Sequence, residues 1–269
     1  MQSSLTVLVD NAGTVSNYSR EAAIYARDTF SASIDADTFL LVGHYKTFES
    51  IYVNITEPGD PGMALVVSFW NGSDWVAAAG VRDETKGFSR SGFLKWDRLQ
   101  TDQASSIISG QHAVFMRISA ANPGTGSVTF AGVNLLLACD TDLRREFPNA
   151  ADEQFLQGQA SHVLIHEASR NDILQELRKR GYATATGGAT VFDLLAIEEI
   201  KQAAVYLALS KIFLNASDSP EDIWMMKSKH YAGRHKDQMA TFLAFDSNDD
   251  GEASSAETRA SIRSYTMSR

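Results

Sequence analysis

Residues near the end of the chain have the types and the spacing of a calcium-binding loop. In the EF-hand pattern, carboxylate and amide oxygens from alternate loop positions, one backbone carbonyl and a final two-oxygen glutamate surround Ca²⁺, and a central glycine permits the sharp turn. Helical patterns are predicted on both sides of this segment, as the motif requires. The sequence therefore predicts a Ca²⁺ site over residues 246–257, built from Asp246, Asn248, Asp250, Gly251, Glu252 through its carbonyl, and Glu257.

A simpler interpretation of the same loop stays open. Short polar side chains also cap helices, so the segment would equally be a connection whose acidic residues cap the last helix. Ala253 occupies the loop position where a β-branched or large apolar residue is usual, and the sequence holds no second loop to pair with this one. Ca²⁺ is the sole cofactor that the sequence predicts, and a sensor role is disfavoured because an unpaired loop has no partner hand to open against.

Two histidines have the spacing of zinc ligands on a helix. His162 and His166 are four residues apart and would share one helix face. The HExxH order is absent and no third ligand is implied, so a surface or interface pair is the preferred interpretation.

The sequence lacks the common motifs of catalytic sites: GxSxG, a phosphate-binding loop, GxGxxG and a cysteine paired with a histidine motif. We therefore predict that the protein is not an enzyme.

Length and composition indicate two folded domains. The chain has 269 residues, 44% hydrophobic and 21% charged, with a formal net charge of −9 that would repel a phosphate backbone. No run of about 18 apolar residues and no basic, apolar leader is present, so we expect a soluble protein made in the cytoplasm, with no membrane partner. Cys139 lies in the apolar run VNLLLAC and is predicted to fill a core.

The first half of the chain has the pattern of an antiparallel β domain. Short runs rich in Val, Ile, Phe and Tyr alternate with Gly, Asn, Asp and Pro clusters. Residues 64–78 predict a hairpin whose turn is Asn71-Gly72-Ser73-Asp74, because Asn-Gly supplies the positive φ of tight turns. Strands are predicted over 5–9, 23–30, 38–44, 50–55, 64–70, 75–78, 92–96, 113–119 and 128–138.

The second half changes to helix formers with a spacing of 3.6 residues. The fold class is predicted to be α+β with two domains, an antiparallel β-sandwich over 1–146 and an α-helical domain over 147–269. Helices are predicted over 152–180, 191–215, 222–245 and 254–268.

Aromatic residues gather in one segment of the β half. A carbohydrate-binding platform would need such rings exposed and coplanar, whereas alternate residues of a strand face inward. Core is the preferred interpretation for most of these rings, with carbohydrate binding as the alternative: Trp70, Trp75, Trp96, Phe88 and Phe93.

The order of motifs in the first half resembles a β domain of tailed-phage virion proteins. That domain combines a Tyr-Trp-Asn-Gly-x-x-Trp hairpin, an Asp-x-Thr-x-Gly segment that ends in Ser-Gly, and a late Trp-Ile-Arg. The corresponding residues here are Phe69-Trp70-Asn71-Gly72 with Trp75, then Asp83, Thr85, Gly87, Ser91 and Gly92, then Met116-Arg117-Ile118, with Phe69 in place of tyrosine and Met116 in place of tryptophan.

The second half resembles the helical head-to-tail connector, or adaptor, proteins of tailed phages. The resemblance rests on a helix with Ala203-Ala204-x-Tyr206-Leu207-x-Leu209, on the Lys227 to Tyr231 spacing and on the acidic terminal loop. It implies a structural virion protein of the neck, a homo-oligomeric, commonly twelvefold ring that contacts the portal and the next neck or tail proteins and lets DNA pass without sequence-specific binding.

Ring formation needs head-to-tail interfaces that close on themselves, and helices with apolar residues on several faces supply them. The candidate interface residues are Ile212, Phe213, Trp224 and Met225. The protein is then expected in the host cytoplasm during assembly and afterwards in the virion. The alternative is another virion structural protein, of a baseplate or collar, or a carbohydrate-binding decoration protein.

Overall fold

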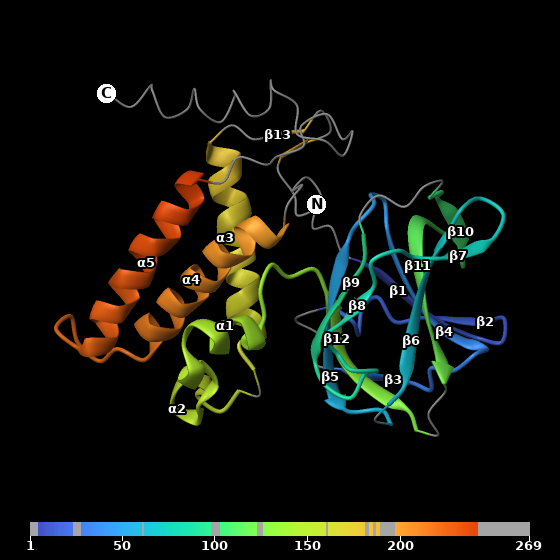
Figure 1. Ribbon diagram of the computed structural model, residues 1–269, viewed down its shortest axis with the longest axis horizontal. Helices are drawn as coiled ribbons and strands as arrows, with labels where there is room; N and C mark the ends of the chain where they lie inside the picture. The colour runs from blue at the N-terminus through green and yellow to red at the C-terminus, as the bar shows by residue number, and fades with distance from the viewer. Residues whose placement is uncertain are drawn as a thin grey trace. The chain divides into compact units, whose positions relative to one another are not determined.

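A computed structural model of the chain describes residues 5–23, 28–60, 62–97, 103–122, 126–159, 161–180, 183–184, 187–188 and 197–241. The chain divides into two compact units, Met1–Leu135 and Leu136–Arg269. The first is built from strands and the second contains the helices (Figure 1), which confirms the α+β fold class with an N-terminal β domain.

The division between the units lies before the predicted boundary at residue 146. Leu137, Ala138 and Leu143 pack in the hydrophobic core of the helical unit. Cys139 is also buried there, as predicted for a core residue. The predicted boundary lies one short helix beyond this division, because the apolar run before that helix packs in the helical core.

The first sheet of the β unit is antiparallel throughout, in the order β2-β1-β4-β11-β6-β7, with β10 also paired to β11. Its central strands are held on both sides by neighbours, which satisfies their backbone donors and acceptors. The strands are β1 Thr6–Asn11, β2 Thr14–Asn17, β4 Thr38–His44, β6 Ala64–Trp70, β7 Trp75–Ala77, β10 Ser106–Ile108 and β11 Gln111–Asn122.

The second sheet has the order β3-β12-β5-β9-β8 and is also antiparallel. It forms a separate layer from the first sheet (Figure 1). The strands are β3 Phe30–Ala32, β5 Ser50–Glu57, β8 Arg82–Asp83, β9 Gly92–Lys95 and β12 Val128–Asn134.

The strand register lines up apolar side chains on one face of the first sheet. Val9 is paired with Leu40, Leu40 with Ile118, and Ile118 with Val67, and all four are buried. Because side chains alternate across a strand, this row belongs to one face, and the residues next to each member belong to the other. The row forms part of the core of a two-layer β-sandwich.

The hairpin predicted from Asn-Gly is present. β6 and β7 pair from Trp70 with Trp75, the Asn71 N–H donates to the Asp74 carbonyl at 3.1 Å, and Gly72 has φ of +103°. The strand predicted over 23–30 is wrong for its described residues before Phe30: the Ala23 N–H donates back to the Arg20 carbonyl at 3.2 Å in a turn, and β3 begins only at Phe30. Strands β2, β8 and β10 were not predicted, because two to four residues are too few to show alternation.

The described part of the helical unit begins with three short helical pieces and continues with three long helices (Figure 1). A small hairpin lies between α3 and α4. The elements are α1 Asp140–Glu146, the 3₁₀ turn η1 Pro148–Ala151, α2 Glu153–Leu156, α3 Val163–Lys179, β13 Ala183–Thr184, β14 Gly187–Gly188, α4 Ile197–Asn215 and α5 Ile223–Thr241.

The single helix predicted over 152–180 is broken into α2 and α3. Gln157 and Gly158 have positive φ values of 49° and 79°, which end α2 after one turn in the left-handed conformation typical of helix C-termini. α4 and the described part of α5 agree with the predicted helices over 191–215 and 222–245. The helix predicted over 254–268 lies outside the described residues.

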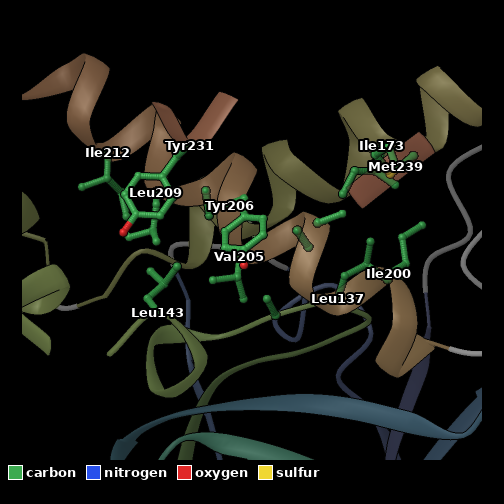
Figure 2. Close-up of a cluster of buried hydrophobic side chains, with 14 of the residues drawn as sticks. Leu137, Leu143, Ile173, Ile200, Val205, Tyr206, Leu209, Ile212, Tyr231 and Met239 are labelled. Carbon is green, nitrogen blue, oxygen red and sulfur yellow. The ribbon is translucent and has the colours of Figure 1, made fainter. Parts of the chain in front are cut away.

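The core of the helical unit joins side chains from α1, α3, α4 and α5 (Figure 2). Leu143, Ile173, Leu209 and Met239 are among its fully buried members. α4 contributes apolar residues from most of its circumference, so it is the central helix of the unit.

Candidate interaction surfaces

The predicted calcium loop lies outside the described residues, so the structure gives no geometry for Asp246, Asn248, Asp250, Glu252 or Glu257. Within the described ranges, no group of three or more His, Cys, Asp or Glu side chains is placed to hold a metal ion. The Ca²⁺ site stays a prediction.

Two of the four predicted interface residues are core residues. Ile212 is 1% exposed and Phe213 is 0% exposed, and both pack among other residues of the helical unit. They cannot touch a second chain while this packing is kept, so their assignment to an interface is corrected. The reason is that α4 is apolar on several sides, and the sequence does not show which side faces outward.

The other two predicted interface residues, Trp224 and Met225, are half-buried. The Trp224 ring stacks on Phe213 at 5.7 Å and meets the edge of Phe155 at 5.1 Å. The Lys227 ammonium lies 4.7 Å from the Trp224 ring centroid, a cation–π contact. Trp224 therefore closes the end of the helical core.

Large apolar side chains are nevertheless exposed at the turn between α4 and α5. Leu214 at the end of α4 is 51% exposed, and Ile223 and Met226 at the start of α5 are 59% and 65% exposed. Ile223 and Met226 are three residues apart, so they share one face of α5. Each of these three residues is next in sequence to one of the predicted interface residues.

The two histidines with zinc-like spacing serve other purposes. His162 Nε2 lies 2.8 Å from the Ala150 carbonyl oxygen, and His166 Nε2 lies 2.9 Å from Asp140 Oδ1. The His162 backbone N–H also donates to the Asp140 carboxylate at 3.3 Å. Both histidines are buried, which excludes the predicted surface pair. Together with Asp140 they join the start of α1 and the 3₁₀ turn to the start of α3.

The pKa of Asp140 reflects this position. Burial raises the pKa of the carboxyl, but the hydrogen bond and charge of His166 and the contacts with His162 lower it more, so the net pKa is below its ordinary value. The ionised carboxylate is therefore part of the folded helical unit at neutral pH.

A second charged group connects α1 with α4 and α5. Arg234 stacks on the Tyr206 ring at 4.0 Å and pairs with Glu146. Asp142 pairs with Lys201 at 3.2 Å and with Arg145 at 3.3 Å. A hollow of about 250 Å³ lies beside this group, lined by Asp142, Arg145, Glu146, Lys201, Gln202 and Val205.

Each charged side chain that lines the hollow is paired with an opposite charge, so the described residues offer a ligand no unpaired charge there. The sequence did not predict the group, because Glu146 and Arg234 are 88 residues apart and no local spacing relates them. Burial raises the pKa of the Cys139 thiol beside it to about 12, which leaves that thiol protonated and unreactive.

The aromatic residues of the β unit separate into two sets. Phe88, Phe93 and Trp96 are buried, which confirms the core interpretation for them. Trp70 and Trp75 are half-buried and meet edge to face, with ring centroids 5.6 Å apart and an interplanar angle of 63°. These two rings are not coplanar, so they do not form the flat platform that the carbohydrate alternative requires.

Trp75 instead lies beside a charged side chain on the first sheet. The Arg117 guanidinium is 4.9 Å from the Trp75 ring and 4.7 Å from the Phe39 ring. Burial lowers the pKa of Arg117, and the charge of Asp10 partly opposes this effect. A signal for this residue was present in the sequence, because Arg117 is the one charged residue in the apolar strand AVFMRIS.

No helix in the described part of the chain is long and apolar enough to cross a membrane.

Comparisons with known proteins give no family. No protein-family model matches the chain, and no curated protein matches it. Among solved structures, the chain is similar to chitosan-binding module 1 of a chitosanase/glucanase from Paenibacillus sp. IK-5, with 11% identity and a TM-score of 0.30 over 49% of this chain and 93% of that module.

It is also similar to a family 89 glycoside hydrolase from Clostridium perfringens, with 12% identity and a TM-score of 0.30 over 65% of this chain. The chain spans about a fifth of the length of that hydrolase, since 20% of it is covered. Similarities at these TM-scores carry no argument about function.

Proposed function

We propose that the chain is a structural subunit of a tailed-phage particle, a connector at the neck whose copies form a ring between portal and tail. The resemblance of both halves to phage proteins suggests this role, and the α4–α5 hairpin is the observation that carries it. In this proposal the helical unit joins neighbouring copies, and the β-sandwich is an appended module.

The exposed side chains at the hairpin turn support an interface between copies. Leu214, Ile223 and Met226 are all more than half exposed. Exposed apolar side chains that share one helix face, as Ile223 and Met226 do, are typical of surfaces that bind another protein. The occupant that we propose is a second copy of this chain, because a ring requires each subunit to meet its neighbour through two different surfaces.

The rigid support beneath these side chains also favours an interface. Phe213 stacks on Trp224, and the Ser228 hydroxyl donates to the Ser210 carbonyl at 2.9 Å between α4 and α5. Contacts fixed in this way lose little conformational freedom when a partner binds. The half-buried Trp224 and Met225 are proposed to form the inner border of the same surface.

The net charge of −9 suits a channel through which DNA moves. A conduit must not retain the polyanion, and an acidic surface repels phosphate groups. DNA would pass without sequence-specific contact, and the portal and the next neck or tail protein would be the stable partners.

Electron microscopy of the purified full-length chain, alone and mixed with its portal protein, tests this function. We expect rings in at least one of the two samples. The double variant Ile223→Ser with Met226→Ser should weaken ring formation at least tenfold in a concentration series. It should leave the stability of the monomer within about 0.5 kcal/mol, because both residues are on the surface.

Ile107→Ser is a matched control, since Ile107 is 71% exposed on the β unit. It should leave ring formation unchanged. A chain that stays monomeric both alone and with the portal would contradict the proposed function. Rings that tolerate the double variant would contradict the proposed interface only.

A further inference from the structure

Arg117 occupies an unusual position on the first sheet of the β unit. The register pairs Leu8 with Leu41 and Leu41 with Arg117, so Arg117 shares a face of the sheet with those two residues and lies on the side away from the sandwich core row. A small apolar cluster covers part of this face: Leu8, Leu41, Ala113 and Phe115, with Val15, Phe39, Trp75 and Ile108 packed against it.

Two rings fix the direction of the guanidinium. Phe39 and Trp75 contribute cation–π contacts at 4.7 Å and 4.9 Å, which restrict the rotamers that a free arginine would sample. Arg117 as a whole stays partly exposed. The planar donor fork is therefore held in place before any ligand arrives.

Among the residues that the structure describes, no carboxylate forms an ion pair with Arg117. Its Nε is buried without a hydrogen-bond partner. No ion pair or hydrogen bond joins its guanidinium to another described residue, and Asp10 acts on it only through charge. A positive charge on an apolar face without a paired carboxylate is costly, since the lost hydration is not replaced.

Shielding of the apolar cluster by the Arg117 side chain does not explain why an arginine is at this position. The apolar stem of an arginine can shield a hydrophobic cluster while its head stays in water. A methionine would shield the cluster equally well without the cost of desolvating a charge. The retained guanidinium points instead to an anionic ligand.

We infer that Arg117, held between Phe39 and Trp75, is a binding site for the carboxylate of an acidic saccharide. The two terminal guanidinium nitrogens match the two oxygens of a carboxylate, the geometry that arginine recognises best. A single ring is enough for a contact with one sugar ring, and the half-exposed Trp75 indole beside Arg117 offers an apolar surface to the C–H face of such a sugar.

The sheet around Arg117 disfavours an acidic peptide as the ligand. A peptide that binds by strand addition needs a free sheet edge. β11 carries Arg117 and is paired along this segment with β4 on one side and β6 on the other, so no edge is available there. A ligand must approach the face of the sheet and bind through side chains alone, as a saccharide does.

Titration of the full-length chain with a galacturonic acid trisaccharide tests this site, with tryptophan fluorescence as the readout. Binding should weaken at least tenfold in Arg117→Met. Arg117→Lys should show an intermediate loss, because lysine keeps the charge but not the two-pronged geometry. Arg82→Met is the matched control, since Arg82 is exposed on the second sheet, and it should bind as the wild type does.

Two further ligands complete the test. A neutral galactose trisaccharide should bind at least tenfold more weakly than the acidic one, and triglutamate should also bind more weakly. Equal binding of the neutral sugar would overturn the role of the carboxylate, and stronger binding of triglutamate would overturn the saccharide assignment. Unchanged binding by Arg117→Met, or no binding by the wild type at millimolar concentration, would overturn the site, and none of these outcomes depends on whether the chain forms rings.

Discussion

The β unit and the helical unit bury different kinds of side chain. Among the described residues, the β unit buries a single histidine or carboxylate side chain, His44. The helical unit buries five, and each of them contacts backbone or side-chain polar groups of another segment or turn: Asp142, His162, His166, Glu167 and His235.

The difference follows from how the two units satisfy their backbones. Strands pair with one another, so the sheet needs few polar side chains in its core. Helices leave backbone groups unpaired at their ends, and the chain of short pieces from α1 to α3 has many ends. Side chains such as His162 supply the missing partners there. Buried polar contacts therefore add to apolar packing in the helical unit, whereas the sandwich depends mainly on apolar packing. The following changes test that contrast.

The largest expected effect is that of Phe213→Ala. Phe213 is fully buried and contacts the rings of Phe147, Phe155, Trp224 and Tyr231, so its loss leaves a large cavity. The helical unit should lose about 3–5 kcal/mol of unfolding free energy. Urea unfolding followed by helical circular dichroism measures this loss. Phe115→Ala, the matched change in the β unit, should leave the helical transition in place, and a shift of that transition would show that the two cores are not independent.

Asp140→Ala tests whether polar contacts stabilise the helical unit. The substitution leaves the His162 backbone N–H and the His166 ring without their acceptor, which should cost about 2–3 kcal/mol. Asp140→Asn keeps one acceptor oxygen and should cost less. The same unfolding measurement compares the two, and equal losses would mean that Asp140 acts through its charge alone.

Acid should weaken the two units through different groups. Burial lowers the pKa of His44 from 6.5 to about 4, so the neutral ring belongs to the folded β unit. Its contribution is complete above pH 6.5 and is lost as the pH falls from there through about 4, a loss of about 3 kcal/mol. His44→Gln should flatten that part of the stability profile.

Asp140 in the helical unit behaves differently. Its pKa in the folded chain lies below 3.8, so its contribution is complete above that value and disappears only as the pH falls further. Unfolding curves at a series of pH values should show these two windows, and a loss due to Asp140 already at pH 6 would contradict this assignment.

The smallest expected effect is that of Lys227→Met. The ammonium of Lys227 lies 4.6 Å from the Phe147 ring and 4.7 Å from the Trp224 ring, and methionine keeps the apolar contact without the charge. We expect a loss of about 0.5–1 kcal/mol in the helical unit. Thermal unfolding of the wild type and the variant measures the difference. A more stable variant would show that the Lys227 charge destabilises the helical unit.

Sequence patterns predicted local elements well where the signal was long. The hairpin over β6 and β7 was predicted from alternation and Asn-Gly, and β4 has the predicted bounds. The helix break at Gln157 and Gly158 was missed because a single glycine is also tolerated inside a helical pattern, so Gly158 alone did not mark an end. His235 is buried, with its Nδ1 2.9 Å from the Ala203 carbonyl oxygen, a contact between α5 and α4 that local spacing does not reveal.

The predicted interface residues also show that a sequence pattern does not decide which side of a helix is buried. Each residue along a helix turns the side chain by about 100°. α4 is apolar on several sides, so periodicity alone could not separate the buried Ile212 and Phe213 from the exposed Leu214. The packing of α5 and the short helices against α4 decided which of them is on the surface.

The segment over 246–257 shows what the sequence by itself determined. Its ligand types and spacing are fully specified by the chain, and they stand as a calcium prediction independent of any packing. The α+β order of the two units was also determined by sequence, because hydrophobic period and turn residues are local properties. Only the tertiary structure placed Arg117 between Phe39 and Trp75. It also showed that His162 and His166 connect α3 to the preceding short helices through polar contacts, and do not act together as metal ligands. These contacts join residues distant in sequence, and the partner of a buried polar group is set by which segments pack together.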